Sequence, residues 1–193
     1  MIFLPQQVGD AAAAILRGEI VAYPTETYYG LAVDALDAAA LERLFVLKGR
    51  GENKASALLV SDLAMFVGLC AEFPPRALAL AKAHWPGPLT LVLPARAGLP
   101  TAIVTDGCVA ARVSSHPLAR ALVSAVGRPI TATSANPSGA PPARHAAALS
   151  ALFPGQRFHI IDGGETPGGA PSTLVRLRGN NVEVLRPGPV AID

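Results

Sequence analysis

The sequence predicts a fold of the α/β class, because short apolar runs rich in β-branched residues alternate with segments of helical periodicity. The chain has 193 residues, of which 51% are hydrophobic and 16% are charged, a composition typical of a protein that buries a sizeable core. That length corresponds to about one domain, and the sequence contains no internal repeat or low-complexity linker. We therefore expect a single domain over residues 1–193.

The first half of the chain is expected to alternate helices with short buried strands. Asp10, Asp37 and Asp62 each stand just before a helical pattern, where a carboxylate can accept hydrogen bonds from free backbone N–H groups. Pro75 suits the first turn of a helix, because its ring fixes φ and its missing N–H is not needed there. The expected order is helix 10–16, strand 19–24, a helix from residue 37 that includes Leu41, Leu44 and Phe45, strand 57–60, helix 62–69, helix 75–84 and strand 90–93.

The second half continues the alternation and ends in a hairpin. The hairpin is expected around residues 179–181, because Gly-Asn-Asn tolerates the positive φ angles that tight hairpin turns need. Glycine and proline, 18 residues each, concentrate in the connections. The expected order is strand 109–113, helix 117–126, strand 130–132, helix 144–152, strand 158–161 and the hairpin strands 173–177 and 182–185.

Charge, cysteine and histidine patterns exclude several classes of protein. A net charge of +2 is too small to indicate nucleic-acid binding. Cys70 and Cys108 lie far apart, and the four histidines form no metal-ligand pair, so we expect neither a disulfide framework nor a protein metal site. The N-terminus lacks the pattern of a signal peptide, and no apolar run reaches the roughly 18 residues of a membrane span. We expect a soluble, cytoplasmic protein with no membrane partner.

The common nucleotide-binding and hydrolase motifs are absent from the sequence. It contains no GxGxxG, no Gly-Lys dipeptide and no GxSxG. This excludes a Rossmann fingerprint, a Walker A loop and a nucleophile elbow. A nucleotide would have to be bound by another arrangement.

Two polar segments in the first half are candidates for a binding site. PTETYYGL (24–31) follows the first buried strand, and ligands of α/β sheets gather beyond the carboxyl ends of strands. A capped turn with inward-packed tyrosines explains this segment about as well. KGRGENK (48–54) carries three cations on a glycine-containing loop that could clamp a polyphosphate. Cations at the end of a helix also complement its dipole, so this segment alone favours the simpler explanation.

Polar residues also gather in the second half. TATSANPSG (131–139) offers hydroxyl and amide groups that can bind phosphate or ribose oxygens, whereas a simple turn would explain two such residues better than five. Ser134 is a poor candidate nucleophile, because no His or Lys stands near it in the sequence. Residues 162–173 form a Gly/Pro-rich loop before the hairpin. Taken singly, Arg112 and Arg186 are typical of surface ion pairs.

Together these segments resemble the YrdC-like threonylcarbamoyl-AMP synthase family. PTETYYGL, KGR, WPGPLT, VAARVSSHP, TSANPSG, PST and LRPG occur in the family's order and cover the chain from about residue 5 to 190. The resemblance implies an α/β domain with a twisted mixed open β-sheet, flanking helices and a concave positive cleft. It also implies the short bacterial form, with no additional C-terminal domain.

The resemblance implies a reaction and roles for individual residues. L-threonine, bicarbonate and ATP, with Mg²⁺, would give threonylcarbamoyl-AMP and pyrophosphate. A threonylcarbamoyl-transferase complex would then modify the adenosine beside the anticodon of tRNA. Lys48 and Arg50 would be catalytic, and Thr27, Arg112 and Ser172 would bind threonine. The implied ATP-binding residues are Lys48, Arg50, Lys54, Ser134, Asn136 and Arg186.

Two alternatives remain open at the level of sequence. A non-catalytic paralogue of the same fold could bind tRNA or double-stranded RNA on the concave surface. Carbamoyl or adenylate chemistry on another acceptor is also possible, as in the related domain of hydrogenase-maturation proteins. Retention of the K-x-R spacing and of Ser134, Asn136 and Arg186 favours the synthase.

Overall fold

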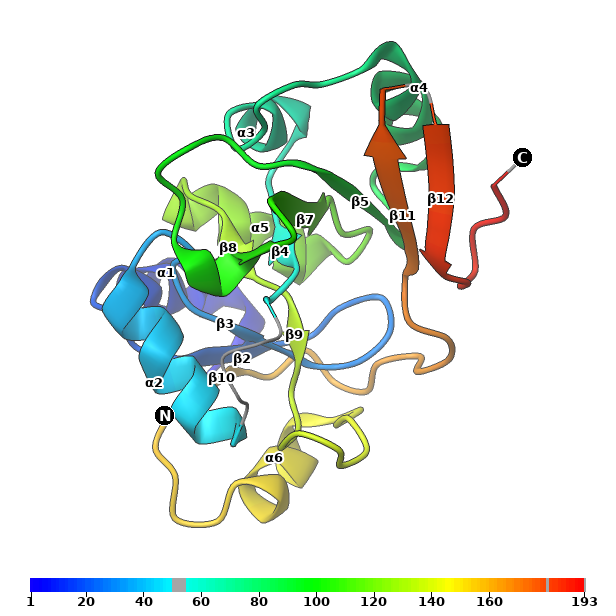
Figure 1. The fold of residues 1–193 in the computed structure, drawn as a ribbon. Coiled ribbons are helices and arrows are strands. Elements are labelled where there is room, and N and C mark those ends of the chain that lie inside the picture. The colour runs from blue at the N-terminus through cyan, green and yellow to red at the C-terminus, as the bar shows by residue number, and fades with distance from the viewer. Residues whose placement is uncertain (50–54, 180, 193) are drawn as a thin grey trace.

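The computed structural model describes residues 1–49, 55–179 and 181–192. These residues form two mixed β-sheets with helices packed around them (Figure 1). The predicted α/β class is confirmed. The described strands lie in two sheets, where one sheet was expected.

The first sheet contains five strands in the order β1-β10-β2-β3-β9. β1, β10 and β2 are parallel, while β3 is antiparallel to both β2 and β9. The bounds are β1 Ile2–Phe3, β10 His159–Ile161, β2 Val21–Tyr23, β3 Gly30–Ala32 and β9 Thr133–Ser134. The carboxyl end of β2 therefore leads directly into the polar segment 24–29.

The second sheet has the order β12-β11-β5-β7-β4-β8, and β6 pairs with β7 outside this path. β12 and β11 form the predicted hairpin, and β11 lies parallel to β5. The bounds are β12 Asn181–Arg186, β11 Thr173–Arg178, β5 Leu89–Pro94, β7 Cys108–Arg112, β4 Leu58–Leu59, β8 Ile130–Thr131 and β6 Val104–Thr105.

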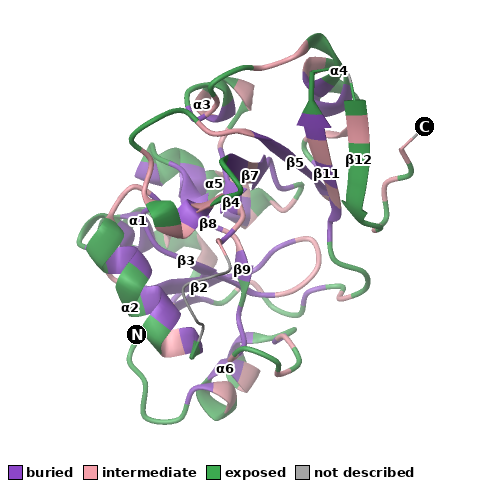
Figure 2. Ribbon diagram, in the orientation of Figure 1, coloured by how far each residue is buried: buried purple, intermediate pink, exposed green. Residues whose placement is uncertain are grey.

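Helices cover the sheets and enclose two hydrophobic clusters. Val21 and Tyr23 of β2 pack in the cluster that contains α1 and α5, while Ala22 points into the larger cluster on the opposite face, as strand alternation requires. Figure 2 shows buried residues along most of the strands, whereas β12 is mostly exposed. The bounds are α1 Val8–Leu16, α2 Ala38–Lys48, α3 Leu63–Val67, α4 Pro75–His84, α5 Pro117–Val126 and α6 Ala146–Leu152, with short 3-10 helices at Pro5–Gln7 and Thr101–Ile103.

Several predicted helix starts are confirmed. The Asp37 carboxylate accepts hydrogen bonds from the N–H groups of Ala39 and Ala40, and Asp62 caps α3 by accepting from Met65. The predicted cap at Asp10 is wrong, because α1 begins at Val8 and Asp10 lies inside its first turn. The predicted helix 62–69 ends earlier, at Val67, and the helix expected from residue 144 begins at Ala146.

Buried hydrogen bonds of Thr131 join the two sheets. Its Oγ1 donates to the carbonyl of Leu31 at 2.8 Å and accepts from the N–H of Val33 at 3.1 Å. The Tyr23 hydroxyl donates to the Thr131 carbonyl at 3.0 Å. Because β8 belongs to the second sheet and β9 to the first, the chain crosses between sheets at residue 132 and carries the 133–136 segment with it.

No helix among residues 1–49, 55–179 and 181–192 has both the length and the apolar character needed to cross a membrane.

Candidate functional site

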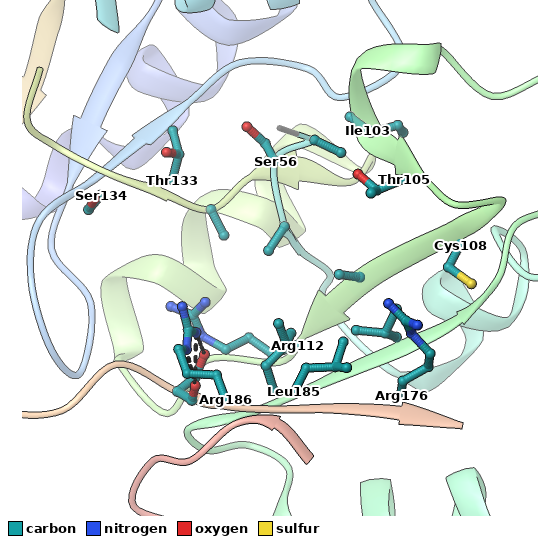
Figure 3. A pocket seen from close by; sticks show the side chains of 17 residues that line it. Ser56, Ile103, Thr105, Cys108, Arg112, Thr133, Ser134, Arg176, Leu185 and Arg186 are labelled. Atoms are coloured by element: carbon teal, nitrogen blue, oxygen red, sulfur yellow. Dashed lines mark hydrogen bonds between the residues drawn. The ribbon is translucent and has the colours of Figure 1, made fainter. Parts of the chain in front are cut away.

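Two adjoining cavities lie between the sheets, with volumes of about 370 Å³ and about 150 Å³. We call them together the intersheet cleft. The larger cavity runs along the second sheet beneath the 132–134 crossing (Figure 3). The smaller one reaches the 25–30 segment of the first sheet. Residues that line both cavities are Arg112, Ala132, Thr133, Ser134, Ser172 and Arg186.

The second sheet gives the larger cavity an apolar floor with cations along it. Arg176, Val92 and Ala110 stand in one row across β11, β5 and β7, because Arg176 pairs with Val92 and Val92 pairs with Ala110. Figure 3 shows Arg176 at one end of this floor and Arg112 beside Arg186 at the other. An apolar surface with a few convergent polar groups is typical of a small-molecule site.

Arg112 is held inside the cleft wall by Glu26. Its Nε donates to Glu26 Oε1 at 3.0 Å, and the two side chains are only 9% and 12% exposed. The Ser114 hydroxyl donates to the other carboxylate oxygen. Burial would raise the pKa of Glu26, but the Arg112 charge and the hydrogen bonds from Ser114 and Arg112 outweigh burial and lower that pKa. Glu26 is therefore an ionised carboxylate behind the arginine.

Arg186, the last residue of β12, is anchored by Ser172, which directly precedes β11. Its Nε and Nη2 donate to the Ser172 carbonyl at 3.2 and 2.8 Å, and Nη2 also reaches the Ser172 hydroxyl at 3.2 Å. That hydroxyl is 2.8 Å from Thr90 Oγ1. Burial and the nearby positive charge of Arg112 lower the pKa of Arg186. Two arginines thus converge on one wall of the cleft.

Lys48 lies behind the 134–136 segment. It is the last residue of α2 and is 4% exposed, and its Nζ donates to the carbonyls of Ser134 at 2.5 Å and Asn136 at 2.7 Å. For Lys48 this confirms the simpler interpretation of the motif, a cation at the end of a helix, over a lysine that projects from a loop. Lys48 is a buried cation that orients the polar segment. Arg50 and Lys54, the other two cations of that motif, lie outside the described residues.

Ser134 and Asn136 differ in their relation to the cleft. Ser134 is exposed, lines both cavities and donates from Oγ to Asn136 Oδ1 at 2.5 Å. Asn136 is 8% exposed, and its Nδ2 donates to the Ala140 carbonyl. Asn136 therefore shapes the turn, while the Ser134 side chain is available to a ligand.

The 25–29 segment is both a capped turn and part of the cleft. Thr25 Oγ1 donates to the Tyr28 carbonyl at 2.6 Å, and Thr27 lines the smaller cavity. The Tyr28 hydroxyl donates to the Gly169 carbonyl at 3.0 Å, and the Tyr29 hydroxyl donates to the Gly164 carbonyl at 2.9 Å. The capped turn is confirmed, with Tyr29 packed inward and Tyr28 partly exposed, and both tyrosines bind the 162–169 loop. Thr27 lines the cavity, and its role in binding stays a prediction.

The structure brings together candidates from five separate segments of the chain. Those that line the cleft are Thr27, Arg112, Ser134, Ser172 and Arg186. Two residues at the cleft are not among the sequence candidates: Glu26, which stands within PTETYYGL, and Arg176. A carboxylate between two threonines was the only signal for Glu26, and Arg176 stands in an ordinary strand pattern.

Comparisons with known proteins extend over most of the chain. A family model for Sua5, YciO and YrdC, described as "Telomere recombination", matches residues 13–188. The threonylcarbamoyl-AMP synthase of Pyrococcus abyssi is 41% identical over 185 residues, which cover 95% of this chain and 54% of that protein. The threonylcarbamoyl-AMP synthase of Halorhodospira halophila is 39% identical, covering 89% of this chain and 90% of that protein.

The fold also matches a solved structure. The crystal structure of P. abyssi Sua5 complexed with L-threonine superimposes with a TM-score of 0.91 and 38% identity, covering 97% of this chain and 57% of that one. The chain therefore spans about half the length of the Pyrococcus proteins that it matches and most of the length of the Halorhodospira protein.

Proposed function

The chain belongs to the Sua5, YciO and YrdC family, and we propose that it synthesises threonylcarbamoyl-AMP from L-threonine, bicarbonate and ATP, releasing pyrophosphate. The observation that carries this proposal is the arrangement of Arg112 and Arg186 on one wall of the intersheet cleft, with Ser134 also on its lining. Such a cleft has donors for a small carboxylate and for a nucleotide side by side.

The chemistry explains why the site would be cationic. Threonine and bicarbonate form a carbamate anion, which must attack the α-phosphate of ATP beside two further phosphates. Like charges repel, so the site must present positive groups where charge accumulates in the transition state. Holding a short-lived carbamate in line with phosphorus is a problem of proximity, which needs no strong protein nucleophile.

Threonine would bind at the smaller cavity. Arg112 would take the substrate carboxylate through its planar guanidinium fork, with Thr27 and Ser172 completing the subsite. Thr27 comes from the turn after β2 and Ser172 from the segment before β11, so both sheets contribute to this subsite.

ATP would occupy the larger cavity and the adjoining polar segment. The Ser134 hydroxyl would contact the nucleotide, Asn136 would hold the segment in shape, and Arg186 would face the phosphates. Lys48 would stabilise phosphate charge from behind the segment, and Arg50 and Lys54 would complete the set of cations. We assign the catalytic roles to Lys48 and Arg50.

Mg²⁺ would enter as part of the ATP substrate. Within residues 1–49, 55–179 and 181–192 there is no group of three His, Cys, Asp or Glu side chains that could hold a metal ion. Glu26, beside the cleft, already accepts hydrogen bonds from Arg112 and Ser114 on its two oxygens. Phosphate oxygens and water are the ligands that Mg²⁺ commonly keeps at such sites.

The product would be consumed by a second reaction. A mixed anhydride of a carbamate and AMP is an activated acyl donor, and a threonylcarbamoyl-transferase complex would use it to modify the adenosine beside the anticodon of tRNA. We place this reaction in the cytoplasm, where ATP and tRNA are both available.

The test is the release of pyrophosphate by the purified protein. With ATP, Mg²⁺, bicarbonate and L-threonine we expect release that falls to background when either threonine or bicarbonate is omitted. Equal release without threonine would refute the synthase and favour carbamoyl or adenylate chemistry on another acceptor. RNA binding that is steeply dependent on salt and indifferent to ATP would instead favour the non-catalytic paralogue.

A further inference from the structure

Glu26 is a partly buried carboxylate that stands behind the cleft wall. It lines neither cavity, and its side chain is 12% exposed. One oxygen accepts from Arg112 Nε at 3.0 Å, and the other accepts from the Ser114 hydroxyl. A ligand in the cleft would therefore meet Arg112, with Glu26 in the layer behind it.

Arg112 binds Glu26 through Nε, which leaves the two terminal nitrogens of the guanidinium available to a ligand. In the described part of the chain, neither terminal nitrogen of Arg112 takes part in a protein hydrogen bond, and the residue lines both cavities. Arg186 differs, because one of its terminal nitrogens is bound to Ser172. Arg112 therefore presents the pair of parallel N–H donors that suits a carboxylate.

The charge of Glu26 has a separate consequence. Arg112 and Arg186 lie close enough that the charge of Arg112 lowers the pKa of Arg186. Glu26 supplies a negative charge directly against one of the two guanidiniums. Without it, two uncompensated cations on one wall would attract any small anion.

We propose that Glu26 is a positioning residue for substrate recognition, which holds Arg112 by Nε so that both terminal nitrogens face the cleft. Its negative charge offsets the positive charge of one of the two arginines. The subsite therefore discriminates against simple anions in favour of an amino acid. This inference rests on the proposed function only for the identity of that amino acid, L-threonine.

A merely structural role for Glu26 makes a different prediction. Ser114 also accepts a hydrogen bond from the N–H of His116 at 3.1 Å, directly before α5, so Glu26 is linked to the start of that helix. If Glu26 served only this link, its replacement would lower stability, and all kinetic parameters would change to a similar extent. A positioning role instead affects threonine selectively.

The experiment compares Glu26→Gln and Glu26→Asp with Glu42→Gln, a matched control at an exposed position of α2. For Glu26→Gln we expect the KM for threonine to rise by about tenfold, with the KM for ATP changed by less than about twofold. Acetate should become an inhibitor competitive with threonine, and Glu26→Asp should restore part of the threonine affinity. An unchanged KM for threonine, or equal increases in both KM values, would overturn the proposal.

A binding measurement separates this inference from the proposed function. L-threonine is titrated into wild type and Glu26→Gln by calorimetry in the absence of ATP. If wild type releases no pyrophosphate but Glu26→Gln binds threonine about tenfold more weakly than wild type, the proposed function fails and the role of Glu26 stands. Equal affinities, or no binding by wild type, would overturn the role of Glu26.

Discussion

The ammonium of Lys48 lies 2.7 Å from the carbonyl oxygen of Asn136, a residue 88 positions later in the chain. The same ammonium also binds the Ser134 carbonyl. One buried cation at the end of α2 thus sets the course of the polar segment that leads into the cleft. This contact therefore contributes both to the stability of the fold and to the geometry of the site.

We predict that Lys48→Met lowers both stability and ATP affinity. Methionine preserves the length of the side chain but cannot donate, so the Asn136 carbonyl loses the ammonium while the Ser134 carbonyl keeps its bond from the Asn136 N–H. A buried carbonyl left unsatisfied costs about 1–3 kcal/mol. Denaturant unfolding should report the stability loss, and the KM for ATP should rise. Lys82→Met, at an exposed position of α4, is the control and should leave both unchanged. An unfolding free energy of Lys48→Met equal to that of wild type would contradict a stabilising role for this contact.

We predict that Arg112→Lys impairs threonine use more than ATP use. Lysine retains the charge that faces Glu26 but loses the planar fork that binds a carboxylate through two N–H groups. The KM for threonine should rise on the order of tenfold or more, with a smaller change for ATP. Steady-state pyrophosphate release at varied threonine measures this effect. Arg96→Lys, at an exposed position after β5, is the matched control, and equal effects of the two variants would contradict the assignment.

We predict that Tyr29→Phe loosens the 162–169 loop. The Tyr29 hydroxyl donates to the Gly164 carbonyl and accepts from the Gly163 N–H, and the ring is fully buried. Loss of these bonds should destabilise the protein by about 1 kcal/mol and accelerate amide hydrogen exchange around residue 163. Tyr28→Phe removes a single bond to Gly169 and should have the smaller effect. Unchanged exchange in Tyr29→Phe would show that the loop is held by other contacts.

The sequence predicted those parts of the fold whose determinants are local. Pro117 opens α5 and Asp37 caps α2 as expected, because each signal lies within a few residues of the helix that it starts. β3 and β9 were not predicted, because each has only two or three residues and shows no extended alternation. Their pairing is fixed by tertiary contacts such as those of Thr131.

The candidate site could be predicted only in part, for the same reason. The motifs identified Thr27, Ser134 and Ser172, which do line the cleft. The Arg112–Glu26 pair joins residues 86 positions apart, so no local pattern could reveal it. Burial of Lys48 depends likewise on a segment far along the chain. Residue type indicates which chemistry is available, whereas the fold decides which groups face the ligand.

We predict a pH dependence of stability that comes from Glu26. Its pKa is below the ordinary value of 4.5 in the folded protein, so the folded state favours the ionised carboxylate more than the unfolded chain does. The resulting stabilisation is fully present above the pKa of the unfolded chain and is lost as the pH falls through the lower folded value. Glu26→Gln has no group that titrates at this position. The unfolding free energy of wild type minus that of Glu26→Gln should therefore be constant near neutral pH. Below about pH 4.5 this difference should fall, because wild type loses the stabilisation. Denaturant titrations at a series of pH values measure it. Glu42→Gln should show no such shift, and a pH-independent difference for Glu26→Gln would mean that the carboxylate gains nothing from Arg112.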